Sequence, residues 1–364
     1  MKPFHKIKPK VISIPNQQVD ERDTMFARMA RIRNSEAYDH YYSINPDLKQ
    51  KDDHIRSLPP LLDHKGKYYD TYNSEHARQL FNSIDNIVID QDIINKYAIL
   101  LTNEKSYSQV LKQIAIELGA VGAGFTKLED KFIYSHKGRF DHNYGRRVTL
   151  DHKNVLVFLV EMDFKQMNFA PKSNVILESA NQYYRAAIIS KTLEAIIMKL
   201  GYDAKAHYDA HYDIILPPLA VQAGLGELGR NNILIADKFG SRVRIGAVTS
   251  NINIEIDLQI SVGANRFCDV CNKCALNCPT KALSINGKSL VRGIEKWATN
   301  VENCYSIWRF YGTDCGICMA ICPFSHNNNW FHYLIRKVVK FFPIFNKILL
   351  FFDDLIYGKK WRIK

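Results

Sequence analysis

All eight cysteines of this 364-residue chain lie between residues 268 and 322, and the first 267 residues contain none. Such crowding suits a disulfide-stabilised fold only in short secreted chains. This chain is long, and no apolar segment typical of a secretion signal follows its N-terminal lysines. The cysteines therefore predict a metal-binding region at the C-terminal end of a larger folded protein.

The cysteine spacing specifies the kind of metal centre. The run Cys268-x2-Cys271-x2-Cys274-x3-Cys278-Pro279 has the spacing of bacterial ferredoxins. A structural zinc site does not explain this run. In such runs the fourth cysteine serves the other cluster. We therefore predict two [4Fe–4S] clusters, one bound by Cys268, Cys271, Cys274 and Cys322, the other by Cys278, Cys304, Cys315 and Cys318.

Charge and hydropathy exclude several other classes. The net charge is +12, but the lysines are spread along the chain and accompany no nucleic-acid module, so no nucleic-acid partner is expected. The most apolar stretch, 338–352, is interrupted by Lys340, Pro343 and Lys347, which argues against a spanning helix. Without a twin-arginine motif we expect a cytoplasmic protein, or an exported one if the sequence is a processed form.

Periodicity divides the chain into four predicted parts. Residues 1–95 are expected to wrap irregularly, apart from a helix over 22–33; 96–257 are α/β; 258–329 are ferredoxin-like; 330–364 form an aromatic, basic tail. Within the α/β part, strands are predicted at 121–125 and 154–162, and a helix over 175–200 with an apolar stripe through Ala186, Ile189, Leu193 and Ile196. Two further strands, 232–236 and 242–249, are predicted to join as a hairpin.

A glycine segment precedes these last strands. Gly224, Gly226 and Gly229 match G-x-G-x-x-G, but the pattern lacks the strand before it and the helix after it that a dinucleotide site requires. We interpret the glycines as positions of close backbone approach, either in a turn or to a ligand. Together with Arg230 they are our candidate cofactor-binding residues.

Four segments resemble the corrinoid and iron–sulfur reductive dehalogenases: 20–28, which includes Arg-Asp-Thr-Met-Phe, 223–230, 267–275 and 312–323. The ending Asp353-Asp354-Leu-Ile-Tyr-Gly358 is also similar to theirs. The resemblance implies a nitroreductase-like α/β domain that binds cobalamin base-off, followed by a ferredoxin-like domain. It further implies reductive removal of halide from an organohalide, with electrons from a reduced ferredoxin, a flavodoxin or a membrane quinol system.

The same resemblance implies a tyrosine proton donor beside an arginine. We assign Tyr184 and Arg244 to these roles, with Tyr183 and Arg242 as rivals, because Tyr183 continues the apolar stripe of the helix. A third polar position of the pocket is expected near His211 or Tyr212. His211 otherwise fits an exposed loop histidine, since Asp209-Ala-His211 lacks the glycine of an axial-ligand motif.

Two alternative functions and one alternative position of the tail remain open. Epoxyqueuosine reductases share an Ala-Gly-Leu-Gly segment and two clusters with this chain. A protein that only carries electrons would need no catalytic tyrosine. The tail has a basic amphipathic pattern, which predicts contact with a membrane surface or a small membrane anchor protein. Packing of the tail on the protein's own core is the competing interpretation.

Overall fold

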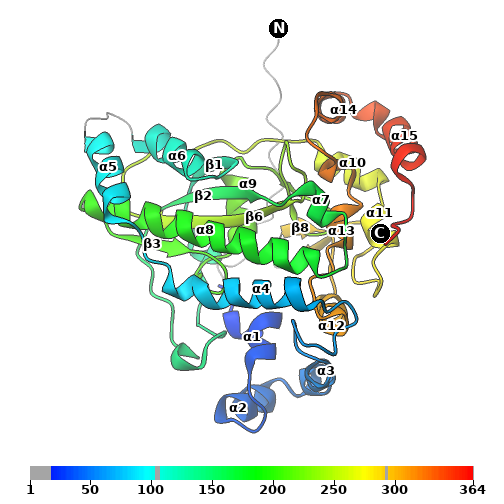
Figure 1. Cartoon of the computed structure of the whole chain (residues 1–364), viewed down its shortest axis with the longest axis horizontal. Coiled ribbons are helices and arrows are strands. Elements are labelled where there is room, and N and C mark those ends of the chain that lie inside the picture. The colour runs from blue at the N-terminus through cyan, green and yellow to red at the C-terminus, as the bar shows by residue number, and fades with distance from the viewer. Residues whose placement is uncertain (1–17, 103–106, 292–293, 364) are drawn as a thin grey trace.

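The computed structural model describes residues 18–102, 107–291 and 294–363. Its centre is a four-stranded antiparallel sheet in the order β1 (Gly122–Lys127), β2 (Asn154–Glu161), β6 (Val243–Ser250) and β3 (Ala204–His207). Figure 1 shows this sheet behind the long helix α8 (Asn174–Lys199). The fold is therefore mixed α/β, with the cysteine region following it; the nitroreductase-like topology stays a prediction.

Strand β2 divides the interior into two apolar cores. Its residues 155–160 are all buried, and alternate side chains point to opposite faces. Leu156, Phe158 and Val160 pack with α8, whereas the other face packs with α9 (Leu216–Gln222). The run of β-formers that predicted this strand is thus continuous because both faces are covered.

Helix α8 confirms the predicted long helix to within a residue at each end. Ala186, Ile189, Leu193 and Ile196 are fully buried against the sheet, as the stripe predicted. Gly201 follows with a φ of +88°, a left-handed conformation that favours glycine and ends the helix.

The predicted hairpin of 232–236 with 242–249 is wrong. Strand β5 (Leu234–Ile235) pairs with β4 (Glu227–Leu228), whereas β6 lies between β2 and β3. An isolated bridge between Ala236 and Gly240 closes the turn that connects the two segments. Because Ala247 and its neighbours are buried on both sides, β6 gains more apolar burial inside the sheet than in a two-stranded hairpin.

The N-terminal part is more helical than expected. It contains η1 (Glu21–Asp23), α1 (Met25–Ala30), α2 (Glu36–Ile44), α3 (Pro46–Ser57), α4 (Thr71–Ser83) and η2 (Ile84–Asn86). Polar composition concealed an aromatic stripe, since Tyr38, Tyr41 and Tyr42 are all buried on one side of α2. Arg28 links this part to the cysteine region, because it bonds Asp52 and reaches Glu302 at 2.9 Å. The basic residues before position 18 lie outside the described residues.

The remaining elements frame the sheet and the cysteines. Beside the sheet lie α5 (Gln91–Thr102), α6 (Tyr107–Glu117), η3 (Asp130–Phe132), η4 (Asp141–Asn143) and α7 (Phe164–Met167). The cysteine region contains α10 (Ala264–Val270), α11 (Lys273–Leu276), β7 (Ser289–Val291), β8 (Ile294–Lys296), α12 (Val301–Tyr311), α13 (Ile317–Ala320) and η5 (Pro323–Ser325). The tail forms α14 (Trp330–Phe341), η6 (Pro343–Phe345) and α15 (Asn346–Tyr357). None of the described helices has the length and apolar character needed to cross a membrane.

Candidate functional site

The thiols of the predicted first set, Cys268, Cys271, Cys274 and Cys322, line one pocket. The assignment of each cysteine to a cluster stays a prediction. Burial raises the pKa of the Cys268 thiol, and its thiol neighbours are Cys322, Cys271 and Cys274. Burial likewise raises the pKa of Cys315 to about 12, with Cys304 and Cys278 beside it. All eight are free of disulfides. Closely grouped buried thiols resist ionisation unless a positive centre compensates their charge, so these two groups fit iron–sulfur clusters.

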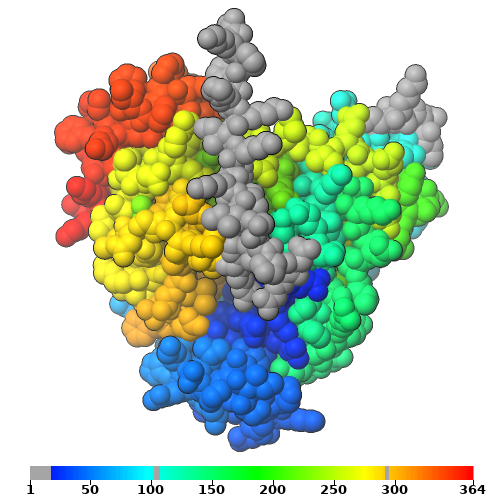
Figure 2. Space-filling view, turned by 180° about the vertical axis from the view of Figure 1, so that it is seen from behind, coloured from blue at the N-terminus to red at the C-terminus, as the bar shows by residue number. Residues whose placement is uncertain are grey.

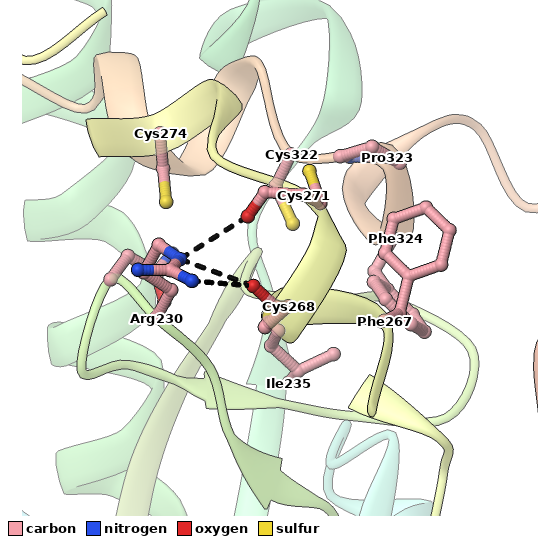
Figure 3. A pocket seen from close by; sticks show the side chains of 10 residues that line it. Arg230, Ile235, Phe267, Cys268, Cys271, Cys274, Cys322, Pro323 and Phe324 are labelled. Carbon is pink, nitrogen blue, oxygen red and sulfur yellow. Dashed lines mark hydrogen bonds between the residues drawn. The ribbon is translucent and has the colours of Figure 1, made fainter. Parts of the chain in front are cut away.

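Arg230 organises the loop of the first set. Its guanidinium donates to the carbonyl oxygens of Cys268 at 2.8 Å and Cys271 at 3.2 Å, as Figure 3 shows. It also donates to the carbonyls of Ser284 and Asn286, both at 3.0 Å. Arg230 was predicted to bind a cofactor; the structure places it on the backbone that presents the thiols.

The glycine segment packs against its own chain. Gly226 has a φ of +157°, and a Cβ there would lie 2.2 Å from the carbonyl oxygen of Ile235. A Cβ on Gly224 would lie 2.5 Å from the carbonyl oxygen of Leu258, and one on Gly229 would meet the Ile235 side chain at the same distance. Gly224 and Gly226 are therefore required by the close approach of neighbouring backbone, whereas a Cβ on Gly229 would meet side chains. Corrinoid binding by these three residues stays a prediction, without support from this geometry.

A second group of polar side chains lies between α8 and β6. The guanidinium carbon of Arg244 lies 4.7 Å from the ring centroid of Tyr183. Its Nη2 donates to Ser179 Oγ at 2.5 Å and to Asp314 Oδ2 at 3.1 Å, while the Ser179 hydroxyl donates to Asp314 at 2.5 Å. Arg244 Nε is buried without a hydrogen-bond partner among the described residues. The site thus joins the sheet, its covering helix and the residue before Cys315.

The structure corrects the expected tyrosine neighbour of Arg244 from Tyr184 to Tyr183. Tyr183 follows Ser179 by four residues, so both side chains lie on the same face of α8. The sequence argument assigned that face wholly to apolar packing, although a buried polar cluster occupies it. Tyr183 and Tyr184 both pack beside the cluster formed by Ala187, Ala206 and Tyr208, but the ring that lies against Arg244 is that of Tyr183. Which tyrosine donates a proton stays a prediction.

Arg242, the alternative to Arg244, is buried among backbone contacts. Only 1% exposed, it donates to the carbonyl oxygens of Ser325 and Met162 and to a carboxylate oxygen of Glu161. These contacts hold the segment after Cys322 against the edge of the sheet. Arg244 is consequently the arginine that faces the tyrosine.

Burial raises the pKa of Tyr183 to about 12, although the nearby Arg244 cation acts to lower it. Burial also raises the pKa of the Asp314 carboxyl, and Arg244 again opposes this effect. Tyr183 is therefore protonated at neutral pH and keeps a proton that it can donate. The guanidinium at 4.7 Å from its ring would stabilise the phenolate left behind.

Residues that the sequence argument missed extend the site. Arg139 donates from Nη1 to Tyr212 Oη at 3.4 Å, and its guanidinium carbon lies 5.0 Å from the Phe26 ring centroid. Phe26 in turn contacts Tyr305 and Trp308, with ring centroids 5.5 and 6.0 Å apart. The position of the two α12 aromatics just after Cys304 was a usable signal. Phe26, by contrast, is remote in sequence.

Of the two candidates for a third polar position, only Tyr212 contacts this group. His211 pairs with Asp85 at 2.7 Å and its ring lies 5.1 Å from that of Tyr208. The tilt between the His211 and Tyr208 rings is 30°, so the imidazole packs against an aromatic neighbour. His211 is thus half-buried in a loop contact of its own, whereas an exposed loop histidine was expected.

Comparisons with known proteins place these features in context. Residues 267–326 match the 4Fe-4S dicluster domain. The chain is 30% identical over 234 residues to the tetrachloroethene reductive dehalogenase of Desulfitobacterium hafniense, covering 61% of this chain and 42% of that protein. A variant of the catabolic reductive dehalogenase NpRdhA matches 98% of this chain and 48% of its own, at a TM-score of 0.75 and 21% identity. A reductive dehalogenase structure described as suggesting a mechanism for B12-dependent dehalogenation matches with a TM-score of 0.71 and 22% identity, over 95% of this chain and 49% of its own.

The chain therefore spans less than half the length of the relatives it matches. The structural match covers nearly all of this chain, including the sheet and the cysteine region together. The fold and the dicluster iron–sulfur region are accordingly shared with these proteins.

Proposed function

We propose that this chain, a relative of the reductive dehalogenases in sequence and in fold, is an oxidoreductase that removes halide from an organohalide. The reaction consumes two electrons and one proton, replaces the carbon–halogen bond with a carbon–hydrogen bond and releases halide. Two clusters in one region suit this task because each carries one electron. The observation that carries the proposal is the Tyr183–Arg244 pair next to Asp314, the residue that precedes Cys315.

The electron route and the chemical site share a chain segment. Asp314 accepts hydrogen bonds from Arg244 and Ser179, and Cys315 follows it directly. Tyr305 likewise follows Cys304 and contacts Phe26. The predicted second thiol set is therefore adjacent to the polar group of Arg244 and Asp314, while the first set lies toward the tail helices. Electrons from a reduced ferredoxin, a flavodoxin or a quinol system would enter through the first set.

A cobalamin is part of the proposal because of the relationship to these enzymes. When bound, it would supply a strongly reducing, nucleophilic metal centre for attack on the organohalide. The residues described here contribute proton delivery and charge stabilisation. Tyr183 donates its phenolic proton to the carbon that loses halide, and Arg244 stabilises the resulting phenolate. Asp314 and Ser179 hold the guanidinium in place.

The aromatic side chains that meet at α12 suggest the class of substrate. Phe26, Tyr305 and Trp308 bring their rings together, and Arg139 adds a cation beside Phe26. Such a group of side chains fits a small chlorinated or brominated carbon compound that packs against rings.

Tyr183→Phe tests the proposal against its matched neighbour. After anaerobic reconstitution with cobalamin and a chemical reductant, we expect the wild-type protein to release halide from a panel of chlorinated and brominated compounds. Tyr183→Phe should lower the rate about 10²–10⁴-fold, the usual contribution of general acid catalysis. Tyr184→Phe should remain close to wild type, with iron and corrinoid content unchanged in both variants.

If Tyr184→Phe loses activity and Tyr183→Phe does not, Tyr184 would be the proton donor. Normal rates in both variants would contradict a tyrosine acid at this position. Absence of halide release from every compound, in a protein that holds both clusters and corrinoid, would contradict dehalogenation and favour a tRNA-modifying reductase or an electron carrier.

A further inference from the structure

The tail helices are firmly attached to the cysteine region through one side. Val339 is buried in the same apolar cluster as Cys268 and Cys322, and Leu349 and Leu350 pack against it. Asp353 pairs with Lys273, which lies between two cysteines of the first set, and with His326 Nε2 at 2.6 Å. The competing interpretation, packing on the protein's own core, is therefore correct for this inner side.

The outer side of the same helices is apolar and uncovered. In α15, the residues at spacings of three and four along one stripe are more than half exposed, with Leu355 at 72%. Figure 1 shows α14 and α15 at the edge of the molecule beyond α10, and Figure 2 shows the tail in red as a projecting rim. We call this the outer tail face; its exposed residues are Trp330, Phe331, Tyr333, Leu334, Phe341, Phe342, Ile344, Phe345, Ile348, Phe351, Phe352, Leu355, Ile356 and Tyr357.

So many contiguous apolar side chains mark an interaction surface, because soluble proteins seldom expose a large apolar patch. Scattered exposed apolar residues elsewhere, such as Ile44 and Val88, belong to no comparable group. Ile348, Phe351 and Leu355 are spaced as on a second apolar stripe of the helix, and all three are more than half exposed among the described residues. The inner stripe of this tail packs on the protein, and the outer stripe is available for contact with another apolar surface.

The charged residues of the tail indicate which apolar surface this is. The tail carries exposed Lys347, Lys359, Lys360 and Arg362 and half-buried Lys340. Its acidic residues, Asp353 and Asp354, pair with Lys273 on the inner side, and Asp354 also lies 3.8 Å from Lys359. Lys337 lies 3.9 Å from Asp237. A second copy of this face would bring like charges together. A bilayer containing anionic lipid offers hydrocarbon for the rings and negative headgroups for the lysines.

We propose that the outer tail face binds the surface of an anionic lipid bilayer and inserts its aromatic and aliphatic side chains without crossing. The two helices have 12 residues each, too few to span hydrocarbon. Trp330, 78% exposed at the start of α14, is a residue type that favours the headgroup level, whereas the Tyr357 hydroxyl is hydrogen-bonded to His332 Nε2 at 2.7 Å. The inference is independent of the reaction proposed above. It also puts the first thiol set, which packs against α14 and α15, on the membrane side of the protein.

Vesicle flotation of the whole cluster-loaded protein tests this binding. We expect wild type to float with phosphatidylcholine vesicles containing phosphatidylglycerol, and much less with phosphatidylcholine alone. Burying one large apolar side chain is worth about tenfold or more in partitioning. The variant Phe351→Ser, Phe352→Ser, Leu355→Ser, Ile356→Ser should therefore lose at least about a hundredfold in vesicle affinity.

Matched variants separate insertion from charge. A fourfold control, Ile32→Ser, Ile44→Ser, Val88→Ser, Leu290→Ser, removes equally exposed apolar side chains elsewhere and should bind like wild type. Replacing Lys347, Lys359 and Lys360 with Gln should weaken binding about fivefold per lysine on anionic vesicles. Iron content and circular dichroism establish that each variant is folded.

A second measurement needs no multiple variant. Trp330 is 78% exposed, so insertion should bring its indole within reach of brominated lipid tails and quench its fluorescence. Trp330→Phe should remove the quenched component. Absence of flotation and quenching in wild type would overturn the proposal, as would full binding by the fourfold tail variant. A concentration-dependent dimer that this variant makes monomeric, without vesicle binding, would assign the face to a second copy instead.

Discussion

The sheet region and the cysteine region are stabilised in different ways. In the sheet region, β2 separates two apolar cores, and Val155, Val157 and Phe158 are fully buried. In the cysteine region the helices are short, with four residues each in α11 and α13. Helices of this length have little stability of their own. One guanidinium, that of Arg230, holds four backbone carbonyls there.

This difference separates two sources of order. Burial of apolar area stabilises the sheet without any bound group. The cysteine region instead depends on ligands that link distant segments, as metal sites do in small domains. The first region should therefore survive removal of iron, and the second should not.

Removal of the clusters is expected to have the largest effect. Chelation of iron under anaerobic conditions should abolish halide release and let the amides of 267–326 exchange rapidly, while β2 and β6 stay protected. Cys318→Ser should give the same result for one cluster, lowering iron from about eight to about four per chain. Hydrogen exchange and iron analysis measure both. Simultaneous loss of protection in β2 would show that the two regions unfold together.

Arg230→Gln should destabilise the cysteine region by about 3–5 kcal/mol, because it leaves buried carbonyls unpaired and removes a buried cation. We expect lower occupancy of the first cluster and a lower unfolding midpoint for that region. Arg230→Lys should rescue only in part, since a single ammonium cannot reproduce the fork of the guanidinium. Arg33→Gln, whose side chain is 52% exposed, is the control. Normal iron content in Arg230→Gln would argue against its organising role.

A pH titration probes the sheet region. Burial lowers the pKa of His207 to about 3, and the neutral ring bonds Thr249 Oγ1 at 2.8 Å. Since the folded pKa lies below the unfolded value, the unfolded state takes up the proton first as the pH falls. Stability should be complete above about pH 6.5 and fall by about 1.4 kcal/mol per pH unit below it.

Denaturant unfolding between pH 7 and 5 measures this slope. His207→Gln should flatten it, whereas His76→Gln, at an exposed position, should leave it unchanged. An unaltered slope in His207→Gln would place the titrating group elsewhere.

The smallest expected effect lies where the two regions meet. Ser179→Ala removes one hydroxyl between Arg244 and Asp314, which should cost about 1 kcal/mol of stability. Because Arg244 keeps its 3.1 Å bond to Asp314, iron content should remain normal. Thermal unfolding measures the loss, and Ser57→Ala on the exposed side of α3 serves as control. A loss of several kcal/mol would mean that the two regions are coupled more tightly than the comparison implies.

The sequence predicted most where a local pattern carries the information. The cysteine spacing predicted the iron–sulfur region that the match to the 4Fe-4S dicluster domain supports, and periodicity predicted α8 and β2. Prediction from the sequence failed where contacts between segments far apart in the chain determine the structure. The place of β6 depends on β2 and β3, and the helices before residue 84 pack through tyrosines that composition counts as polar surface. Tyr183 was assigned to the core because a helical stripe does not distinguish an apolar neighbour from Arg244.

The link between Arg28 and Glu302 joins residues 274 positions apart. Phe26 and Tyr305 meet across a similar separation, and Arg244 needs Asp314. During synthesis the ribosome must therefore release the chain through Asp314 before these contacts can form. The sheet can form earlier, since β6 ends at Ser250. Loading of any bound group beside these residues is thus expected only after α12 has been released and the N-terminal helices have closed against it.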